Sequence, residues 1–501
     1  MDSSPARRHC RRRVTRLLAA AALILHAVAG LTHEAPRPVV DALTAAGISP
    51  HNVAIWVHAV DAEQPSVQFN AETPMNPASV MKLVTAFAAI DALGAAHTWT
   101  TRIATNGALE NGILGGDLVI VGGGDPVLGF DRLWKLLYRL RALGVHTIRG
   151  DIVLDDGVLR LPAHDPHAFD GRGLRPYNSG PYGLLLHFNT VHLHLQPGAS
   201  PGQPVHVSIS PPLSGITIEN RIQTSAGACG AWHRQLDATL STGAGQPALV
   251  LNGTLPASCG ARDWSAAPFA PAEYARALVD ALWREVGGNL EGTVRTISRR
   301  KDAGRQLQTL ITDASPALAE VVREMNKWSS NVIARQLLAY LAREDTSQTD
   351  MVAAGAARAA ERLRIHGIEI DGLVIENGSG LSRNERIRAD RLGQLLLVAW
   401  RQPWMPEFIS ALPVAGSDGT AFRRLTDSPA RGHAHVKTGT INHVRAIAGY
   451  VLDRDGRRHV VVMMVNDLNA HASTAAQDAL LEWVWSGDHT IPAPSRHGPS
   501  H

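Results

Sequence analysis

Hydrophobic positions along this chain follow two different periods. Apolar residues alternate through Ala446–Leu452 and run on through Val460–Val465, a pattern typical of adjacent β-strands. Residues 77–93 form one long apolar segment instead, with Asn76 before it as the cap, Pro77 at its first position and Gly94 after it. These are the usual boundary residues of a helix. We therefore expect a protein of the mixed α/β (α+β) class.

The middle of the chain changes character twice. Segments 117–121, 132–143 and 148–154 have the pattern strand, helix, strand, and 272–286 is again helical. Between them, short strands alternate with Gly, Pro, Ser and Thr at 192–195, 205–210, 216–222 and 248–251. We expect an inserted α/β domain at 99–188 and 269–299, with a small β domain nested at 189–268. The flanking ranges, 31–98 and 300–488, form the main domain, and Ser298–Lys301 links back to it.

Composition narrows the function classes. The chain has 501 residues, of which 45% are hydrophobic and 19% charged, so several packed domains are expected rather than a disordered chain. A formal net charge of +3 gives no polybasic field, and only 5% of the residues are aromatic. A nucleic-acid partner is therefore not expected.

The N-terminus has the layout of a secretory signal. Several arginines precede the apolar stretch Leu17–Ala29, which ends in Ala27-Val28-Ala29. We expect residues 1–29 to be a signal peptide and the mature protein to be exported, that is, periplasmic. The alternative is an uncleaved amphipathic anchor, so membrane association is loose at most. The Pro-, Ser- and His-rich tail, 489–501, is expected to be disordered.

The cysteines and histidines indicate a disulfide rather than a metal. Cys10 would be removed with the signal peptide, which leaves Cys229 and Cys259. An even number of cysteines in an exported chain favours a bridge, with two free thiols as the alternative. His192 and His194 alternate along a strand, but no third ligand is fixed by spacing, so we expect no metal and no cofactor. Gly122–Gly124 lacks a nucleotide-binding motif and is interpreted as a turn.

The lysines are few enough to single out. The chain has 43 arginines but only five lysines, and arginine, unlike lysine, cannot give up its proton in a protein. Lys82 lies three residues after Ser79 at the start of the predicted helix, so the hydroxyl and the amine share one face. The first turn also leaves the Ser79 N–H free. This turn can supply a nucleophile, a base and an oxyanion donor.

Two further motifs follow in order. Ser329 and Asn331 form an S-x-N sequence at the start of a second predicted helix, and Lys437-Thr438-Gly439-Thr440 precedes the two strands described above. Gly439 leaves room for another backbone or a ligand to approach. Ser79 and Ser329 are 250 positions apart, which agrees with a main domain split by insertions.

Together, S-x-x-K, S-x-N and K-T-G resemble the motif set of the penicillin-binding proteins and serine β-lactamases. Segments 325–331, 376–383 and 412–420 extend the resemblance to the PBP4-type D-alanyl-D-alanine carboxypeptidases/endopeptidases, the class C low-molecular-mass penicillin-binding proteins of peptidase family S13. The resemblance covers nearly the whole mature chain. One departure is Asn377, which stands where aspartate is expected before Gly378-Ser379-Gly380-Leu381.

The resemblance implies a transpeptidase-type domain, an antiparallel sheet flanked by helices, split by two inserted domains. Ser79 would be acylated, and Lys82, neutral because of burial and the nearby charge of Lys437, would accept its proton. Ser329 would relay a proton and Asn331 would hold Lys82 or the substrate. Lys437, which we expect to stay charged, would bind the substrate carboxylate together with Thr438, Gly439 and Thr440. The N–H groups of Ser79 and Thr440 would stabilise the oxyanion.

The resemblance also implies the substrate, peptidoglycan stem peptides ending in D-Ala-D-Ala and their D,D cross-links, and inhibition by β-lactams. Asp155, or its neighbour Asp156, could meet the amine of the diamino acid in the stem peptide; a surface turn is the simpler interpretation. Two alternatives stay open, a serine β-lactamase and a non-catalytic wall-binding module. A β-lactamase would need a water-activating Glu, which the sequence does not assign. The sequence leaves the oligomeric state undetermined.

Overall fold

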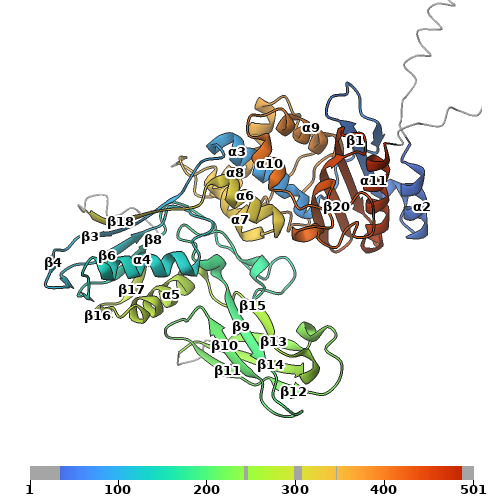
Figure 1. The fold of residues 1–501 in the computed structure, drawn as a ribbon. Helices are drawn as coiled ribbons and strands as arrows, with labels where there is room; N and C mark the ends of the chain where they lie inside the picture. Colours follow the sequence, from blue (N-terminus) through green and yellow to red (C-terminus); the bar gives the residue numbers. More distant parts are fainter. Residues whose placement is uncertain (1–33, 242–245, 298–306, 346, 488–501) are drawn as a thin grey trace, which may run out of the picture.

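The structure is a computed structural model that describes residues 34–241, 246–297, 307–345 and 347–487. The chain folds into a helix-flanked sheet, from which an α/β layer and then a β unit project (Figure 1). The predicted signal peptide at 1–29, the tail at 489–501 and the link Ser298–Lys301 lie outside the described residues. Across the ranges that are described, no helix combines the length and the apolar character needed to cross a bilayer.

The main domain is built on one antiparallel sheet with the strand order β19-β20-β21-β1-β2. In β1, Val53, Ile55 and Val57 pack on one face, while Ala54 and Trp56 pack on the other. The sheet is buried on both faces, which explains why its strands are nearly continuous runs of apolar residues. Its strands are β1 (Val53–Ala59), β2 (Val67–Phe69), β19 (Ala434–Ile441), β20 (Val444–Leu452) and β21 (Arg458–Asn466).

Helices cover both faces of this sheet. Helices α2 (Arg37–Ala45) and α11 (Thr474–Ser486) pack on one face, at the far right of Figure 1. The other helices of the main domain share the core on the opposite face, between the sheet and the insertion. They are α3 (Lys82–Leu93), α6 (Leu318–Lys327), α7 (Asn331–Tyr340), α8 (Met351–Ile365), α9 (Ala389–Trp400) and α10 (Met405–Ser410).

The α/β insertion has its own sheet, in the order β17-β8-β6-β3-β18, with a smaller sheet β16-β7-β5-β4 beside it. Helices α4 (Phe130–Ala142) and α5 (Pro271–Glu285) pack in its core. The larger sheet contains β3 (Thr100–Thr105), β6 (Leu118–Val121), β8 (Ile152–Asp155), β17 (Val294–Ile297) and β18 (Gln308–Ala314), and the smaller one β4 (Leu109–Glu110), β5 (Ile113–Leu114), β7 (Thr147–Ile148) and β16 (Asn289–Leu290).

Two expectations for the insertion need correction. The strand predicted at 148–154 is two strands, β7 and β8, in different sheets. Gly150 separates them at a point where a Cβ would lie 2.6 Å from the backbone of Gly116. The return to the main domain, predicted at residue 300, comes later, because β18 pairs with β3 as an edge strand of the insertion. The predicted turn at Gly122–Gly124 lies directly after β6, with Gly124 at a φ of +78°.

The nested β unit lies inside the predicted range 189–268. Its strands are β9 (Val191–Gln196), β10 (His206–Ser210), β11 (Thr217–Asn220), β12 (Gln223–Ser225), β13 (Leu236–Ser241), β14 (Ala248–Pro256) and β15 (Arg262–Ala266). The predicted bridge between Cys229 and Cys259 is confirmed, and both cysteines pack at the core of this unit. His192 and His194 are each within 2.9 Å of a side chain of β15, Ser265 and Asp263 respectively.

Candidate active site

Ser79 lies in a tight turn at the start of α3. The predicted helix does not begin as an α-helix at Pro77, because a 3₁₀ turn, η2 (Ala78–Met81), comes first. Ala78 has a φ of 44°, a conformation that tertiary contacts impose on a non-glycine residue. Asn76 fixes this turn, since its Oδ1 accepts from the Ala78 N–H at 2.8 Å and its Nδ2 donates to the Ser382 carbonyl at 2.9 Å.

Lys82 is fully buried, and its amine is held on three sides. The Nζ atom lies 3.1 Å from Ser79 Oγ and 2.7 Å from Asn331 Oδ1, and it also donates to the Ser379 carbonyl oxygen. Burial, together with the charge of Lys437, brings the pKa of Lys82 well below its ordinary value. The side chain therefore has the placement and the electrostatics of a base for the Ser79 hydroxyl.

Ser329 lies at the junction of α6 and α7. Its φ is 58°, and this left-handed residue turns the chain between the two helices. Ser330 caps α7 by accepting from the Ile333 N–H at 3.3 Å, which makes Asn331 the first residue of that helix. The middle residue of the S-x-N motif, Ser330, is therefore the cap of α7, and it fixes the backbone on which Ser329 and Asn331 lie.

Lys437 comes to the same place from β19. Its Nζ donates to Ser329 Oγ at 2.9 Å and to the Thr438 carbonyl oxygen at 2.8 Å. Burial lowers the pKa of Lys437 to about 7. The Lys437 side chain is completely buried. Thr438 Oγ1 donates to Thr420 Oγ1 at 3.0 Å.

Gly439 allows β19 to pass against the Ser79 turn. A Cβ at this position would lie 2.5 Å from the Pro77 carbonyl oxygen and 3.0 Å from the Ser79 nitrogen. β19 is an edge strand of the sheet, so one side of its backbone faces away from β20. Thr440, the next residue, is exposed. The oxyanion pair expected from Ser79 and Thr440 is compatible with this close approach.

The loop at 376–385 contains the segment 376–383, which resembles the family. It makes contacts that the sequence analysis missed. Besides the Ser379 carbonyl on Lys82, Asn377 Oδ1 accepts from the Ser379 N–H at 2.9 Å and from its hydroxyl at 2.6 Å. Asn377 Nδ2 donates to the Leu381 carbonyl at 3.0 Å, a bond that aspartate could not make. The departure at Asn377 therefore keeps the turn and removes a charge.

The α/β insertion reaches the site through residues 169–179. The Tyr177 carbonyl oxygen accepts from Asn331 Nδ2 at 3.1 Å and from Arg335 at 3.3 Å. Phe169 packs against the small cluster that contains Ala78. Asp170 holds this segment by accepting from the Tyr177 hydroxyl at 2.7 Å. No signal in the sequence marked these contacts, because the decisive one is made by a backbone oxygen.

The structure places Asp155 at the end of β8, where its carboxylate accepts from the Gly157 N–H at 2.9 Å. Asp156 is buried beside it. The predicted catalytic residues, by contrast, come together in one cluster around Ser79: Lys82, Ser329, Asn331 and Lys437 are joined to each other or to Ser79 by hydrogen bonds.

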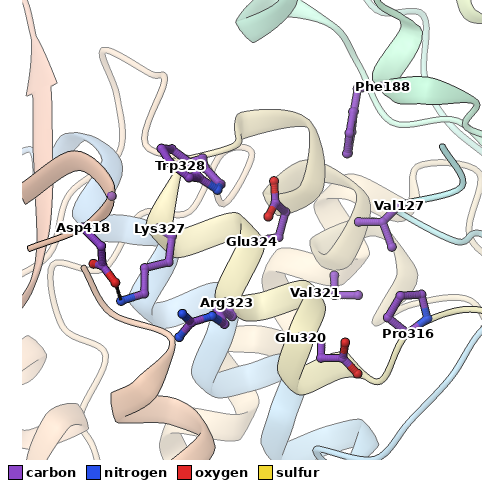
Figure 2. Close-up of a pocket in the computed structure, with 11 residues that line it drawn as sticks. Val127, Phe188, Pro316, Glu320, Val321, Arg323, Glu324, Lys327, Trp328 and Asp418 are labelled. Carbon is purple, nitrogen blue, oxygen red and sulfur yellow. Dashed lines mark hydrogen bonds and ion pairs between the residues drawn. The ribbon is translucent and has the colours of Figure 1, made fainter. Parts of the chain in front are cut away.

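A cavity of about 500 Å³ lies along α6 and is also lined by Val127 and Phe188 (Figure 2). Trp328, which is 65% exposed, and Phe188 stand on its upper side in the view. Lys327 Nζ and Asp418 Oδ2, 2.6 Å apart, form an ion pair at one end. Asp418 Oδ1 also accepts from the Val414 N–H, so the ion pair ties α6 to the segment that carries Thr420.

A Ser–Lys pair that begins a buried helix, facing a K-T-G edge strand, defines an active-serine hydrolase of the penicillin-recognising class. The comparisons with known proteins identify the family. Residues 38–486 match the family model "D-Ala-D-Ala carboxypeptidase 3 (S13)", and the chain belongs to this family.

Individual relatives agree with this assignment. The chain is 30% identical to a D-alanyl-D-alanine carboxypeptidase of Actinomadura sp. (strain R39), over 81% of this chain and 76% of that protein. It is 26% identical to the D-alanyl-D-alanine carboxypeptidase DacB of Haemophilus influenzae, over 83% and 85% of the two chains. The fold matches the crystal structure of penicillin binding protein 4 (dacB) from H. influenzae with a TM-score of 0.74, at 24% identity and over 89% and 99% of the chains.

Proposed function

We propose that this protein is a serine-type D-Ala-D-Ala carboxypeptidase that works through an acyl-enzyme on Ser79. The observation that supports this most directly is the position of the Lys82 amine, 3.1 Å from the Ser79 hydroxyl, in an environment that lowers its pKa. An amine that is neutral near the working pH can accept the hydroxyl proton as the oxygen attacks a carbonyl.

The remaining residues have distinct roles in this proposal. The N–H groups of Ser79 and Thr440 bind the oxyanion of the tetrahedral intermediate. Ser329, hydrogen-bonded to Lys437, passes a proton to the leaving amine of the terminal D-Ala. The peptide bond breaks, the penultimate D-Ala stays on Ser79 as an ester, and water then releases it. Asn331 orients Lys82 through the 2.7 Å hydrogen bond.

The substrate is proposed to be a peptidoglycan stem peptide that ends in D-Ala-D-Ala. Its terminal carboxylate would be bound by Lys437 in the protonated form, with Thr438, Gly439 and Thr440 along the edge strand. β-Lactams would acylate the same serine; one of the related H. influenzae structures, which matches with a TM-score of 0.72, is a β-lactam complex.

Hydrolysis of D,D cross-links is the second activity of this site in our proposal. A cross-link brings a second stem peptide, and the cavity lined by Trp328, one residue before Ser329 in the sequence, offers space for it. Asp155 remains our candidate for the amine of the diamino acid. The substrate lies outside the cytosol, which agrees with the expected signal peptide and an exported, periplasmic protein.

Turnover of diacetyl-L-Lys-D-Ala-D-Ala tests the proposal. We expect release of D-Ala by the wild type, and release only at background level by Ser79→Ala and Lys82→Ala. A control, Ser66→Ala, removes a hydroxyl whose hydrogen bond is to the Val57 carbonyl in the sheet, and its activity should be unchanged. Release of D-Ala by Ser79→Ala at the wild-type rate would contradict the proposal. Rapid loss of the penicillin adduct would instead indicate a β-lactamase.

A further inference from the structure

Glu385 is a buried carboxyl group that the mechanism above does not use. Its side chain has no exposed surface, although acidic residues are seldom buried completely. Oε1 accepts from the backbone N–H groups of Glu376, Asn377 and Gly378 at 3.1, 3.0 and 2.9 Å. Oε2 has no hydrogen-bond partner among the described residues. Such a burial is costly unless the charge is compensated nearby.

The loop that Glu385 holds is the loop that touches Lys82. Ser379, one residue after the last of the three N–H donors, offers its carbonyl oxygen to Lys82 Nζ. On the side of α3, Thr85 Oγ1 donates to the Gly378 carbonyl at 2.7 Å. The position of the Ser379 oxygen therefore depends on the hydrogen bonds that Glu385 accepts.

Glu385 is also the buried carboxyl group of this site. Asn377 is neutral, and the Glu376 side chain is exposed. The charged groups that face Lys82 are Lys437 on β19, Arg335 on α7 and Glu385. After burial itself, the two cations lower the pKa of Lys82, and Glu385 acts against them by raising it. Burial raises the pKa of Glu385, and its three backbone hydrogen bonds oppose that effect.

We propose that Glu385 is a positioning residue for acylation, which holds the Ser379 carbonyl on Lys82 and provides the counter-charge of the Lys82 amine. The proposal rests on the function proposed for Ser79 and Lys82. Its chemical reason is that a general base works best when its pKa lies close to the working pH. With two cations nearby and no carboxylate, the amine would be neutral but weakly basic.

The variant Glu385→Gln separates charge from geometry. Glutamine keeps the size and one oxygen acceptor, and its amide replaces the oxygen that has no partner. The rate of acylation by benzylpenicillin should rise with pH as Lys82 loses its proton, and we call this rise the acid limb of the pH profile. In Glu385→Gln we expect the acid limb to move to lower pH by about half a unit or more, because loss of the negative charge disfavours protonated Lys82. The rate on the plateau should fall as well. A role limited to loop structure would lower the rate at every pH and leave the limb in place.

Two matched variants complete the test. Glu385→Asp keeps the charge, so the acid limb of its pH profile should stay at the wild-type pH, even if its rate of acylation falls. Glu376→Gln removes an exposed charge from the same loop and should leave the limb unmoved. An unmoved limb in Glu385→Gln, or an equal shift in Glu385→Asp, overturns the proposal.

If Glu385→Gln does not fold, Asn377→Asp takes its place. This variant adds a carboxylate to the loop and should move the limb to higher pH; a limb at the wild-type position overturns the proposal. Failure of the wild type to react with penicillin would instead mean that the function proposed for Ser79 is wrong. Normal acylation of the wild type with an unmoved limb in the variants rejects the inference about Glu385 alone.

Discussion

The backbone carbonyl of Tyr177, in the insertion, accepts a hydrogen bond from the side-chain amide of Asn331 at 3.1 Å. Because this bond uses the NH₂ side of the amide, the Oδ1 atom is directed to Lys82, 2.7 Å away. The insertion therefore orients a residue of the catalytic cluster. A residue of the insertion, 98 positions after Ser79 in the sequence, is in this way part of the site.

Asn331→Asp should damage acylation strongly. The carboxylate cannot donate to Tyr177, and its negative charge raises the pKa of Lys82, so less of the free base is present at neutral pH. We expect a loss on the order of 10²-fold in the rate of acylation by benzylpenicillin, which is the usual worth of a well-placed general base. Asn220→Asp is the matched control, because Asn220 makes the same kind of bond to a backbone carbonyl in the nested β unit. Wild-type acylation by Asn331→Asp would show that the amide does not orient Lys82.

The alkaline limb of the pH profile should depend on the substrate carboxylate. Burial lowers the pKa of Lys437 to about 7, so the protonated amine that would bind a carboxylate is lost as the pH rises through this range. As the pH rises through this range, kcat/KM for diacetyl-L-Lys-D-Ala-D-Ala should fall. The same peptide with an amidated C-terminus should react slowly and without this limb. Equal alkaline limbs for the two peptides would mean that Lys437 does not bind the carboxylate.

Gly439→Ala should separate the edge strand from the Ser79 turn. Its Cβ would meet the Pro77 carbonyl oxygen at 2.5 Å, and this oxygen belongs to the backbone, so it cannot rotate away. We expect a loss of about 1 to 3 kcal/mol in the free energy of unfolding, as for an overpacked core, together with slower acylation. Gly115→Ala is the control, since its nearest contact is an ordinary 3.6 Å. Thermal unfolding and penicillin labelling measure both effects, and wild-type values of both for Gly439→Ala would refute the close approach.

The disulfide should stabilise the nested β unit without affecting the chemistry. Cys229 and Cys259 close a loop of 30 residues, for which the chain-entropy relation gives about 3 to 4 kcal/mol. The double variant Cys229→Ser/Cys259→Ser should therefore unfold at lower urea concentration, while acylation of Ser79 below that concentration should keep its rate. A proportional loss of acylation under folding conditions would show that this unit supports the active site.

Asp155→Ala tests the proposed contact with the diamino acid. If Asp155 binds the amine of the stem peptide, the variant should lose more activity on cross-linked peptidoglycan fragments than on a neutral dipeptide substrate. Asp151→Ala is a control, because Asp151 directly precedes the same strand, β8, and its carboxylate accepts from Thr293 and Arg295. Equal losses on both substrates would remove Asp155 from the binding site.

The centre of the site was predicted from the resemblance of three ordered motifs to a known family, and local spacing supported only part of it. Ser79 and Lys82 are three residues apart at the start of a helix, so helical geometry alone places them together. Ser329 and Lys437 could be assigned because their motifs are short and ordered along the chain. The predicted helices and strands around them also appear in the structure, as α3, α7, β19, β20 and β21.

The rest of the site depends on contacts that leave no pattern in the sequence. The oxygens of Tyr177 and Ser379 are backbone atoms, which any residue would carry, and they come from segments far from Ser79. The left-handed conformation of Ala78 is imposed by packing, since Gly380 lies directly against its carbonyl. The lowered pKa of Lys437 follows from complete burial, which the sequence does not reveal.

The acylated residue tests the central claim most directly. The protein would be incubated with benzylpenicillin, digested and analysed by mass spectrometry. We predict one stable adduct of the mass of the intact drug on the peptide that contains Ser79, and none in Ser79→Ala. An adduct on Ser329 or any other residue of the wild type, or a protein left unmodified while it remains folded, would contradict the assignment of Ser79 as the nucleophile.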